Sequence, residues 1–389
     1  MYWWSDFDPG EVRDEFDVIA DLGLELVRIF LLWEDWQPSP GEVSPAALDA
    51  FGQVCDLASD RGLGLDVTLF TGHMSGPSWT PPWMLRPHEP KPDRIRQVVS
   101  GGRPVDCGYT NPFSDPLCLL AAETFLQTVV RRYRDHPGIA IWNLGNEPDL
   151  FAWPPSADAG RAWVRRMTAR IHDLDPAHPV TCGLHAASLT EDNGLRVHEV
   201  FDEVDLAVMH AYPMYIPWIG NPLDPDFVPF TCALTTALCG RPTLVEEFGG
   251  CTTARGEPSA TWAWNAYGQP RHQFMASEEQ LAAFVGQVLP KLVEVGALGA
   301  ILWCFADYHE DLYQRPPCDE SRHERNFGLV RRDGSLKLHA EVLRRFAATR
   351  PVVQKATRRV HLDVRPEEYY RDPLAHAVAA HRRFVEAGA

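Results

Sequence analysis

Short, almost continuous apolar runs alternate with longer amphipathic segments along most of this chain. The amphipathic segments repeat their apolar positions every three or four residues and predict helices at 9–22, 44–61, 115–134, 156–174, 195–203, 227–239, 277–296 and 334–348. The apolar runs predict strands at 25–33, 63–70, 139–144, 179–184, 205–210, 242–248 and 298–305. Apolar strands separated by helices are typical of a parallel sheet that is covered on both faces.

The order of these elements favours an α/β fold of the (β/α)8 TIM-barrel type, which needs eight strands and eight helices. The first strand is the one that is missing, because the chain enters the loop before helix 9–22 directly. Either Tyr2 to Trp4 are its remnant or the native start lies upstream. A doubly wound open sheet is the alternative, but no Gly-x-Gly-x-x-Gly follows an early strand.

We therefore expect one barrel domain over residues 1–348, with its first strand missing or truncated. Residues 349–389 are too few to bury a core of their own. They include a short amphipathic stretch near 373–386. We expect them to form a C-terminal tail that packs on the barrel.

The net charge and the cysteines of the chain indicate which binding partners and which cellular compartment to expect. The chain carries 36 Lys and Arg against 53 Asp and Glu, a formal charge of −17, which disfavours nucleic acid and anionic membrane surfaces. No apolar run approaches the ~18 residues of a membrane helix, and the first residues do not resemble a signal peptide. The nine cysteines form no Cys-x-x-Cys pair. These features predict a cytoplasmic protein with an uncharged small-molecule substrate.

Carboxylates at the ends of two predicted strands are the strongest chemical signal. Glu147 follows strand 139–144 in Asn-Glu-Pro, and Glu246 and Glu247 end strand 242–248. Charges are costly in a barrel lining unless they are paired or functional, and the carboxyl ends of barrel strands share one face. Two carboxylates across one cleft suit glycoside hydrolysis, in which one protonates the leaving oxygen and the other meets the anomeric carbon. The structural alternative is an Asn/Pro turn with an incidental glutamate.

Metal-dependent hydrolysis is the main chemical alternative to this interpretation. His210 ends one predicted strand, and Asp307, His309, Glu310 and Asp311 follow the last one. A metal-dependent barrel hydrolase is expected to carry a His-x-His pair near its first strand, and the chain has none. A single histidine at a strand end is more often a hydrogen-bonding residue. We expect neither a metal nor another cofactor.

Asn146-Glu147-Pro148 and Glu247-Phe248-Gly249 resemble the acid/base and nucleophile motifs of clan A glycoside hydrolases, especially family five, the cellulase and mannanase family. The resemblance covers residues 9–348 in element order. Further positions that match the family's substrate-site pattern are Arg28, His73, His210, Tyr212 and Trp303. Each motif is short, but together they occur in the family's order.

The resemblance implies a role for each residue. Glu147 is the acid/base and holds its proton in the resting enzyme, whereas Glu247 is the nucleophile, kept ionised and oriented by Arg28 and Tyr212. Asn146 contacts the sugar 2-hydroxyl, His73 and His210 line the sugar site, and Trp303 offers an aromatic platform. Retention predicts carboxyl groups ~5–5.5 Å apart, against ~6.5–9.5 Å for inversion.

The doublet Glu246-Glu247 leaves the nucleophile ambiguous by one residue. Adjacent strand residues face opposite sides, so only one of the two is expected at the barrel mouth. The family pattern places Glu directly before Phe-Gly and selects Glu247. Glu246 is then expected to be a structural charge that faces the helix layer.

The substrate expectation depends on loops. The long loops 71–114 and 249–276 hold Trp79, Trp83, Trp262 and Trp264, which could close one end of a cleft and favour exo-action on short oligosaccharides. Segments 31–36 and 70–76 resemble β-mannosidase-like members of the family. We therefore expect a β-mannosidase acting on a neutral oligosaccharide or glycoside.

Other activities of the same clan stay open, namely β-galactosidase, β-glucosidase and endo-β-1,4-glucanase or mannanase. A barrel that binds glycans without hydrolysing them is the alternative from a different class, although such proteins usually lack one of the two carboxylates. The sequence does not indicate the oligomeric state.

Overall fold

The computed structural model describes residues 2–388, and the chain forms two compact units. Unit 1 extends to Gly183 and includes Asn193–Leu206, and unit 2 consists of Leu184–Asp192 and the chain from Ala207 onward. All seven predicted strands are present, and each pairs in parallel with its neighbours. The α/β expectation is therefore correct at the level of elements.

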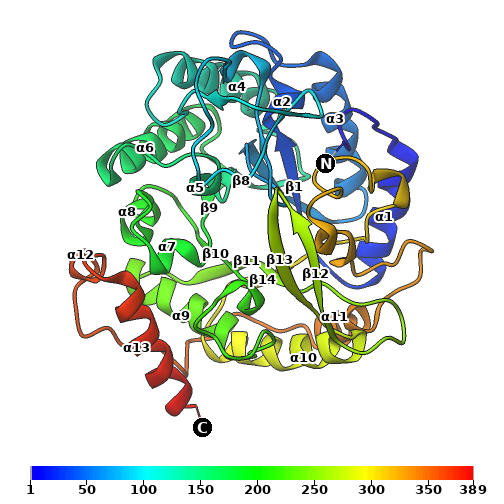
Figure 1. The fold of residues 1–389 in the computed structure, drawn as a ribbon, viewed down its shortest axis with the longest axis vertical. Helices are drawn as coiled ribbons and strands as arrows, with labels where there is room; N and C mark the ends of the chain where they lie inside the picture. Colours follow the sequence, from blue (N-terminus) through cyan, green and yellow to red (C-terminus); the bar gives the residue numbers. More distant parts are fainter. Residues whose placement is uncertain (1, 389) are drawn as a thin grey trace. The chain divides into compact units, whose positions relative to one another are not determined.

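Unit 1 is built on a four-stranded parallel sheet (Figure 1). Its strands, in spatial order, are β1 (Leu26–Leu32), β2 (Gly64–Thr71), β8 (Ile139–Asn146) and β9 (Val180–Gly183). Every residue of β2 after Gly64 and almost every residue of β8 is buried, as expected for strands covered on both faces. The carboxyl ends of these strands carry the unit's candidate residues.

Helices alternate with the strands of unit 1. They are α1 (Pro9–Asp21), α3 (Pro45–Ser59), α4 (Pro116–Tyr133), α6 (Ala157–Leu174) and α8 (Val197–Phe201), with the single turns α2 (Trp33–Trp36) and α5 (Pro148–Phe151). The four long ones begin at an Asp or Ser whose side-chain oxygen accepts a backbone N–H of the first turn: Asp8, Ser44, Asp115 and Ser156. Figure 1 shows α4 and α6 side by side.

Loop 71–114 has structure of its own. It contains the short strands β3 (Ser78–Trp79), β4 (Leu85–Arg86), β5 (Val98–Ser100), β6 (Arg103–Val105) and β7 (Gly108–Tyr109), with the 3-10 turn η1 (Pro82–Met84). Trp79 is fully buried, and the Trp83 indole N–H donates to the Gln37 carbonyl at 2.8 Å. These two tryptophans therefore pack within unit 1. Residues 2–8 form a turn without a strand.

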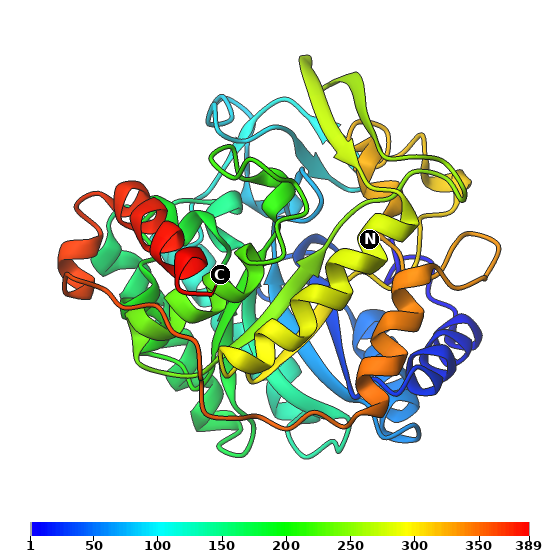
Figure 2. The same ribbon diagram turned by 90° about the horizontal axis from the view of Figure 1, so that it is seen from below.

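Unit 2 contains a three-stranded parallel sheet of β10 (Ala207–Ala211), β11 (Thr243–Gly249) and β14 (Gly299–Trp303). Its main helices are α9 (Phe227–Cys239), α10 (Glu278–Glu294) and α11 (Leu338–Ala348), with the short turns α7 (Ala187–Thr190), η2 (Pro213–Tyr215), η3 (Glu310–Leu312) and η4 (Arg322–Asn326). Figure 2 shows α10 and α11 running side by side.

Loop 249–276 forms an antiparallel hairpin that the sequence analysis did not predict. Its strands are β12 (Ala260–Ala266) and β13 (Gln269–Met275), joined by the two-residue turn Tyr267-Gly268. Both turn residues have positive φ, 52° and 75°, which is the geometry of a type I′ turn. The alternation Thr-Trp-Ala-Trp-Asn before Tyr-Gly was the signal for it.

The C-terminal residues belong to unit 2. Helices α12 (Pro366–Tyr369) and α13 (Pro373–Glu386) follow an extended segment, and α13 packs against α7 and α9. The hydroxyls of Tyr369 and Tyr370 donate to the backbone carbonyls of Leu189 and Ser188 at 2.7 and 2.8 Å. None of the helices among residues 2–388 has the length and apolar character needed to cross a membrane.

Candidate active site

Arg28 and Asn146 meet at the carboxyl end of the unit 1 sheet. An Arg28 terminal nitrogen donates to the Asn146 side-chain oxygen at 3.0 Å, and Arg28 Nε donates to Thr68 Oγ1 at 3.0 Å. Both Arg28 and Asn146 are at most 9% exposed. Because the arginine fixes the oxygen of the amide, the Asn146 amide group has a defined orientation.

His73 contributes to this arrangement through its backbone. Its carbonyl accepts a hydrogen bond of 3.0 Å from Asn146 Nδ2. Gly72, just before it, has no room for a side chain, since a Cβ there would lie 2.6 Å from the Phe151 ring. Unit 1 therefore brings together three of the candidate residues, Arg28, Asn146 and His73, and His73 contacts Asn146 through its peptide carbonyl.

Glu147 has an unusual backbone conformation. It lies between β8 and α5 with φ 44° and ψ 57°, in the left-handed region that non-glycine residues rarely adopt. Its N–H donates to the Gly183 carbonyl at 2.9 Å. Pro148 follows as the first residue of α5, and its ring restricts the backbone just after Glu147. Strained residues of this kind cost ~1–3 kcal/mol and cluster at functional sites, so the conformation makes Glu147 one of a few candidate functional positions.

Glu246, Glu247 and His210 form a buried group in unit 2. His210 Nε2 lies 2.9 Å from Glu246 Oε2, and His210 Nδ1 lies 3.5 Å from Glu247 Oε1. Glu246 and His210 are at most 1% exposed, and Glu247 is 7% exposed. A ring nitrogen that carries a proton can donate to a carboxylate, so His210 can bind Glu246 through Nε2 while Nδ1 lies beside Glu247.

The place of Glu246 differs from the expectation that it faces the helix layer. The pairing of β10 with β11 shifts register between Met209 and His210, so that Met209 pairs with Val245 but His210 pairs with Glu247. One extra residue on β11 interrupts the simple alternation of faces. The bulge lets both glutamates approach one histidine, which strict alternation did not anticipate.

Tyr212 orients Glu247 directly. Its hydroxyl donates to Glu247 Oε2 at 2.8 Å, while His210 lies beside Oε1. Both oxygens of this carboxylate therefore have a polar neighbour, His210 from the end of β10 and Tyr212 from just after it. Such contacts favour the ionised form of a carboxylate and fix its rotamer. Within unit 2 the predicted residues Glu247, His210 and Tyr212 are thus in contact.

Trp303 ends β14 and lies close to the Glu-Phe-Gly motif. It packs with Tyr212 on an apolar cluster of Cys251, Met275 and Phe327. Gly249 pairs with Trp303 in the sheet, and a Cβ on Gly249 would lie 2.6 Å from the Trp303 carbonyl oxygen. The glycine of the motif is therefore required by the close approach of β14.

A polar network beside Tyr212 was not predicted. His323 Nε2 lies 3.0 Å from the Tyr215 hydroxyl and 2.9 Å from an Arg271 nitrogen, and 3.2 Å from Glu324 Oε1. The Tyr215 ring lies 5.6 Å from that of Tyr212. The network joins hairpin β12–β13 to the loop after β14, so no spacing within one segment could have indicated it.

Segment 31–36 of unit 1 holds two carboxyl groups with altered acidity. Burial, followed by repulsion from Asp35, raises the pKa of Glu34 to about 8, although N–H groups of the 101–102 turn oppose the shift. Burial also raises the pKa of Asp35 to about 6. Glu34 Oε2 accepts the Gly101 N–H at 2.8 Å, which ties this segment to loop 71–114.

Neither unit on its own, over residues 2–388, contains three His, Cys, Asp or Glu side chains arranged to hold a metal ion. All nine cysteines are free thiols, and burial raises the pKa of the Cys232 and Cys318 thiols to about 12. Such thiols are poor nucleophiles and poor ligands.

Part of the chain is similar to a known family and to individual known proteins. Residues 123–226 match the family model described as GH family 5 beta-mannosidase-like. A probable mannan endo-1,4-beta-mannosidase F of Aspergillus flavus is 30% identical over 139 residues, 33% of this chain and 29% of the relative. Mannan endo-1,4-beta-mannosidase A of Hypocrea jecorina is 25% identical over 265 residues, 64% and 58% respectively. The matches thus span less than two thirds of these relatives.

Solved structures agree with these matches. An exo-beta-1,4-mannosidase from Opitutaceae bacterium strain TAV5 is similar with TM-score 0.73 and 26% identity, over 90% of this chain and 57% of that one. A GH5_18 protein from Streptomyces cattleya, solved as a variant in complex with Manβ1-4GlcNAc, gives TM-score 0.79 at 20% identity, over 98% and 87%. The α/β fold therefore matches that of family-five barrels.

The chain is thus similar, in part of its sequence and in its fold, to clan A of the glycoside hydrolases. Within that clan the similarity is to the β-mannosidase-like part of family five, which the motifs of the sequence also resemble.

Proposed function

We propose that the chain is a retaining glycoside hydrolase that removes mannose from β-mannosides or short β-linked oligosaccharides, with Glu247 as nucleophile and Glu147 as acid/base. The observation that carries this proposal is the Glu247 carboxylate, which ends a fully buried strand with Tyr212 at 2.8 Å and His210 at 3.5 Å. A nucleophilic carboxylate needs this kind of fixed, ionised setting. The strained backbone of Glu147 supports the second role.

The reaction takes two steps. In the first, a Glu247 oxygen bonds to the anomeric carbon, the glycosidic C–O bond breaks, and the leaving oxygen takes the proton of Glu147. In the second, Glu147 takes a proton from water, the water oxygen bonds to the anomeric carbon, and the ester to Glu247 breaks. Both glutamates return to their starting states. Asn146, oriented by Arg28, is assigned to the 2-hydroxyl, and Trp303 to the face of the sugar.

Mannose as the cleaved sugar is supported by the activities of similar proteins. The family model is β-mannosidase-like, one similar solved structure is an exo-β-1,4-mannosidase, and another was solved with Manβ1-4GlcNAc. Exo-action is favoured by hairpin β12–β13, whose partly buried Trp262 packs on the same apolar cluster as Tyr212 and Trp303. An aromatic side chain on the cluster that holds Tyr212 and Trp303 is suited to limiting the number of sugar units bound.

Endo-action on mannan is the second candidate, because the curated relatives above are endo-1,4-β-mannosidases. The two modes give different first products. An exo-enzyme releases mannose from β-1,4-mannooligosaccharides from the start of the reaction, whereas an endo-enzyme first releases shorter oligosaccharides. Product analysis at low conversion, together with a panel of aryl β-glycosides, separates these modes and also tests the galactoside and glucoside alternatives.

Azide rescue tests the roles of the two glutamates. Glu247→Ala should lose nearly all activity and, with azide, form the glycosyl azide of inverted anomer, because azide takes the place of the nucleophile. Glu147→Ala should still cleave substrates with good leaving groups and, with azide, form the product of retained anomer. Retention of full activity by both Glu147→Gln and Glu247→Gln would rule out the glycosidase proposal.

A further inference from the structure

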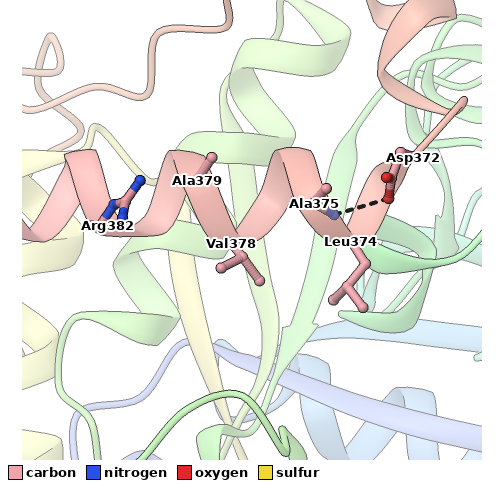
Figure 3. A pocket seen from close by; sticks show the side chains of 6 residues that line it. All are labelled: Asp372, Leu374, Ala375, Val378, Ala379 and Arg382. Carbon is pink, nitrogen blue, oxygen red and sulfur yellow. Dashed lines mark hydrogen bonds between the residues drawn. The ribbon is translucent and has the colours of Figure 1, made fainter.

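Helix α13 presents an exposed apolar stripe on its outer face. Its inner face is buried through Ala377, Ala380 and Phe384, whereas Leu374 and Val378 are 46% and 39% exposed. With Ala375 and Ala379 they line a shallow surface depression that ends at Asp372 and Arg382 (Figure 3). Two adjacent apolar side chains and two alanines on one exposed face suit contact with another helix.

The ends of this stripe carry opposite charges. Asp372 caps the helix by accepting the Ala375 N–H at 3.2 Å, and Arg382 stands ten residues further along. Within residues 2–388 Arg382 makes no ion pair or hydrogen bond, whereas Arg358 and Arg383 of the same tail pair with Asp226 and Asp363. The stripe therefore has a negative end at Asp372 and a positive end at Arg382, and within residues 2–388 the charge of Arg382 has no ion-pair partner.

We propose that the partner of this face is a second copy of the chain, whose α13 lies antiparallel across a twofold axis. An antiparallel pair of such helices brings Asp372 of each copy to Arg382 of the other. The same register, centred at the level of residue 377, also brings Ala375 to Ala379 of the other copy. Because a twofold interface must be complementary to itself, this agreement between the charges and the small residues selects the second copy.

The size of the stripe sets the strength of the dimer. Helix α13 has 14 residues and is ~21 Å long, so a single helix pair buries an area at the low end for specific interfaces. The alanines allow close approach of the helices, and Leu374 and Val378 supply the apolar contact. The dimer should therefore form and dissociate with protein concentration.

Sedimentation equilibrium of the full chain, from low micromolar to several hundred micromolar, tests this inference. The wild type should convert from monomer to dimer, and Arg382→Glu should weaken dimerisation at least about tenfold, because the introduced carboxylate of each copy then faces Asp372 of the other. Val378→Asp should also abolish the dimer. Arg359→Glu, the same change of charge at an exposed arginine outside the stripe, is the matched control and should behave as the wild type.

Mixing two charge variants separates pairing between the copies from the loss of a helix cap. Asp372→Lys removes both the charge and a helix cap, so the single variant cannot distinguish pairing from uncapping. An equimolar mixture of Asp372→Lys with Arg382→Glu restores opposite charges at both ends of a heterodimer, whereas it cannot restore a cap. Recovery of dimer in the mixture supports the pairing. A wild type that stays monomeric, a dimer insensitive to Arg382→Glu and Val378→Asp, or a mixture without recovery would each overturn the inference.

Discussion

The hydroxyl of Tyr212 lies 2.8 Å from Oε2 of Glu247 and donates a hydrogen bond to it. Glu247 ends a buried strand and Tyr212 follows the neighbouring one, so the contact depends on the pairing of β10 with β11. His210, two residues before Tyr212, occupies the side of the other carboxylate oxygen. One short segment, His-Ala-Tyr, thus supplies two polar neighbours to one carboxylate.

Removing this hydrogen bond should slow turnover. Hydrogen bonds to charged groups contribute ~1.5–3 kcal/mol, so Tyr212→Phe should lower kcat about 10- to 100-fold with little change in KM. Steady-state kinetics on an aryl β-mannoside measure both constants. Tyr215→Phe is the control, because its hydroxyl lies 3.0 Å from His323 Nε2 in the network beside Tyr212, and it should retain most of kcat. Equal losses in the two variants would contradict a specific role for Tyr212.

Replacing each glutamate of the doublet by glutamine shows which of the two is the nucleophile. Glu246→Gln should keep most of the activity, because glutamine can still form a hydrogen bond with His210 and Glu247 is unchanged. Glu247→Gln should be inactive, since an amide is not a nucleophile. The reverse result would move the nucleophile to Glu246 while leaving the family assignment intact.

Glu34 should make the folded chain less stable as the pH rises toward 8. Its pKa of about 8 in the folded chain lies above the ~4.3 of an unfolded glutamate, so the folded state holds the proton more tightly. That contribution is complete below the unfolded pKa and is lost as the pH rises through 8. Glutamine does not titrate, so Glu34→Gln does not lose stability in this way. The melting temperature of the variant minus that of the wild type should therefore increase by a few degrees from about pH 5 to about pH 9. Glu42→Gln, at an exposed position, should show a constant difference, and parallel curves for Glu34→Gln would refute the expectation.

Gly249 should tolerate no side chain. Its φ is 150°, and a Cβ would approach the Trp303 carbonyl oxygen to 2.6 Å, so β11 and β14 would have to separate. Gly249→Ala should lower the free energy of unfolding by ~2–4 kcal/mol, measured by chemical denaturation. Gly220→Ala, where no atom lies within 4 Å of the new Cβ, should change it by less than ~0.5 kcal/mol.

The sequence predicted the strands and main helices well because long, strongly periodic segments carry their own signal. Helix α9, for example, has the predicted bounds Phe227–Cys239. The order of motifs selected Arg28 and Asn146 as site residues, but their hydrogen bond to one another was not predicted.

Features that depend on pairing between segments were not predictable in the same way. The bulge that brings Glu246 to His210 arises from the register of two strands, which hydrophobic alternation does not specify. The network of Tyr215, Arg271 and His323 joins three segments that are far apart in the chain. Hairpin β12–β13 was overlooked because its exposed strands lack a continuous apolar run.

Covalent trapping of the glycosyl-enzyme tests the central claim most directly. A 2-deoxy-2-fluoro-β-mannosyl fluoride carries a good leaving group but forms a slowly hydrolysed intermediate, so the sugar should accumulate on the nucleophile. Mass spectrometry of the digested protein should locate one fluoromannosyl group on Glu247, and Glu247→Ala should take up none. A label on Glu246, or mannoside turnover by wild type with no covalent label at all, would contradict the account.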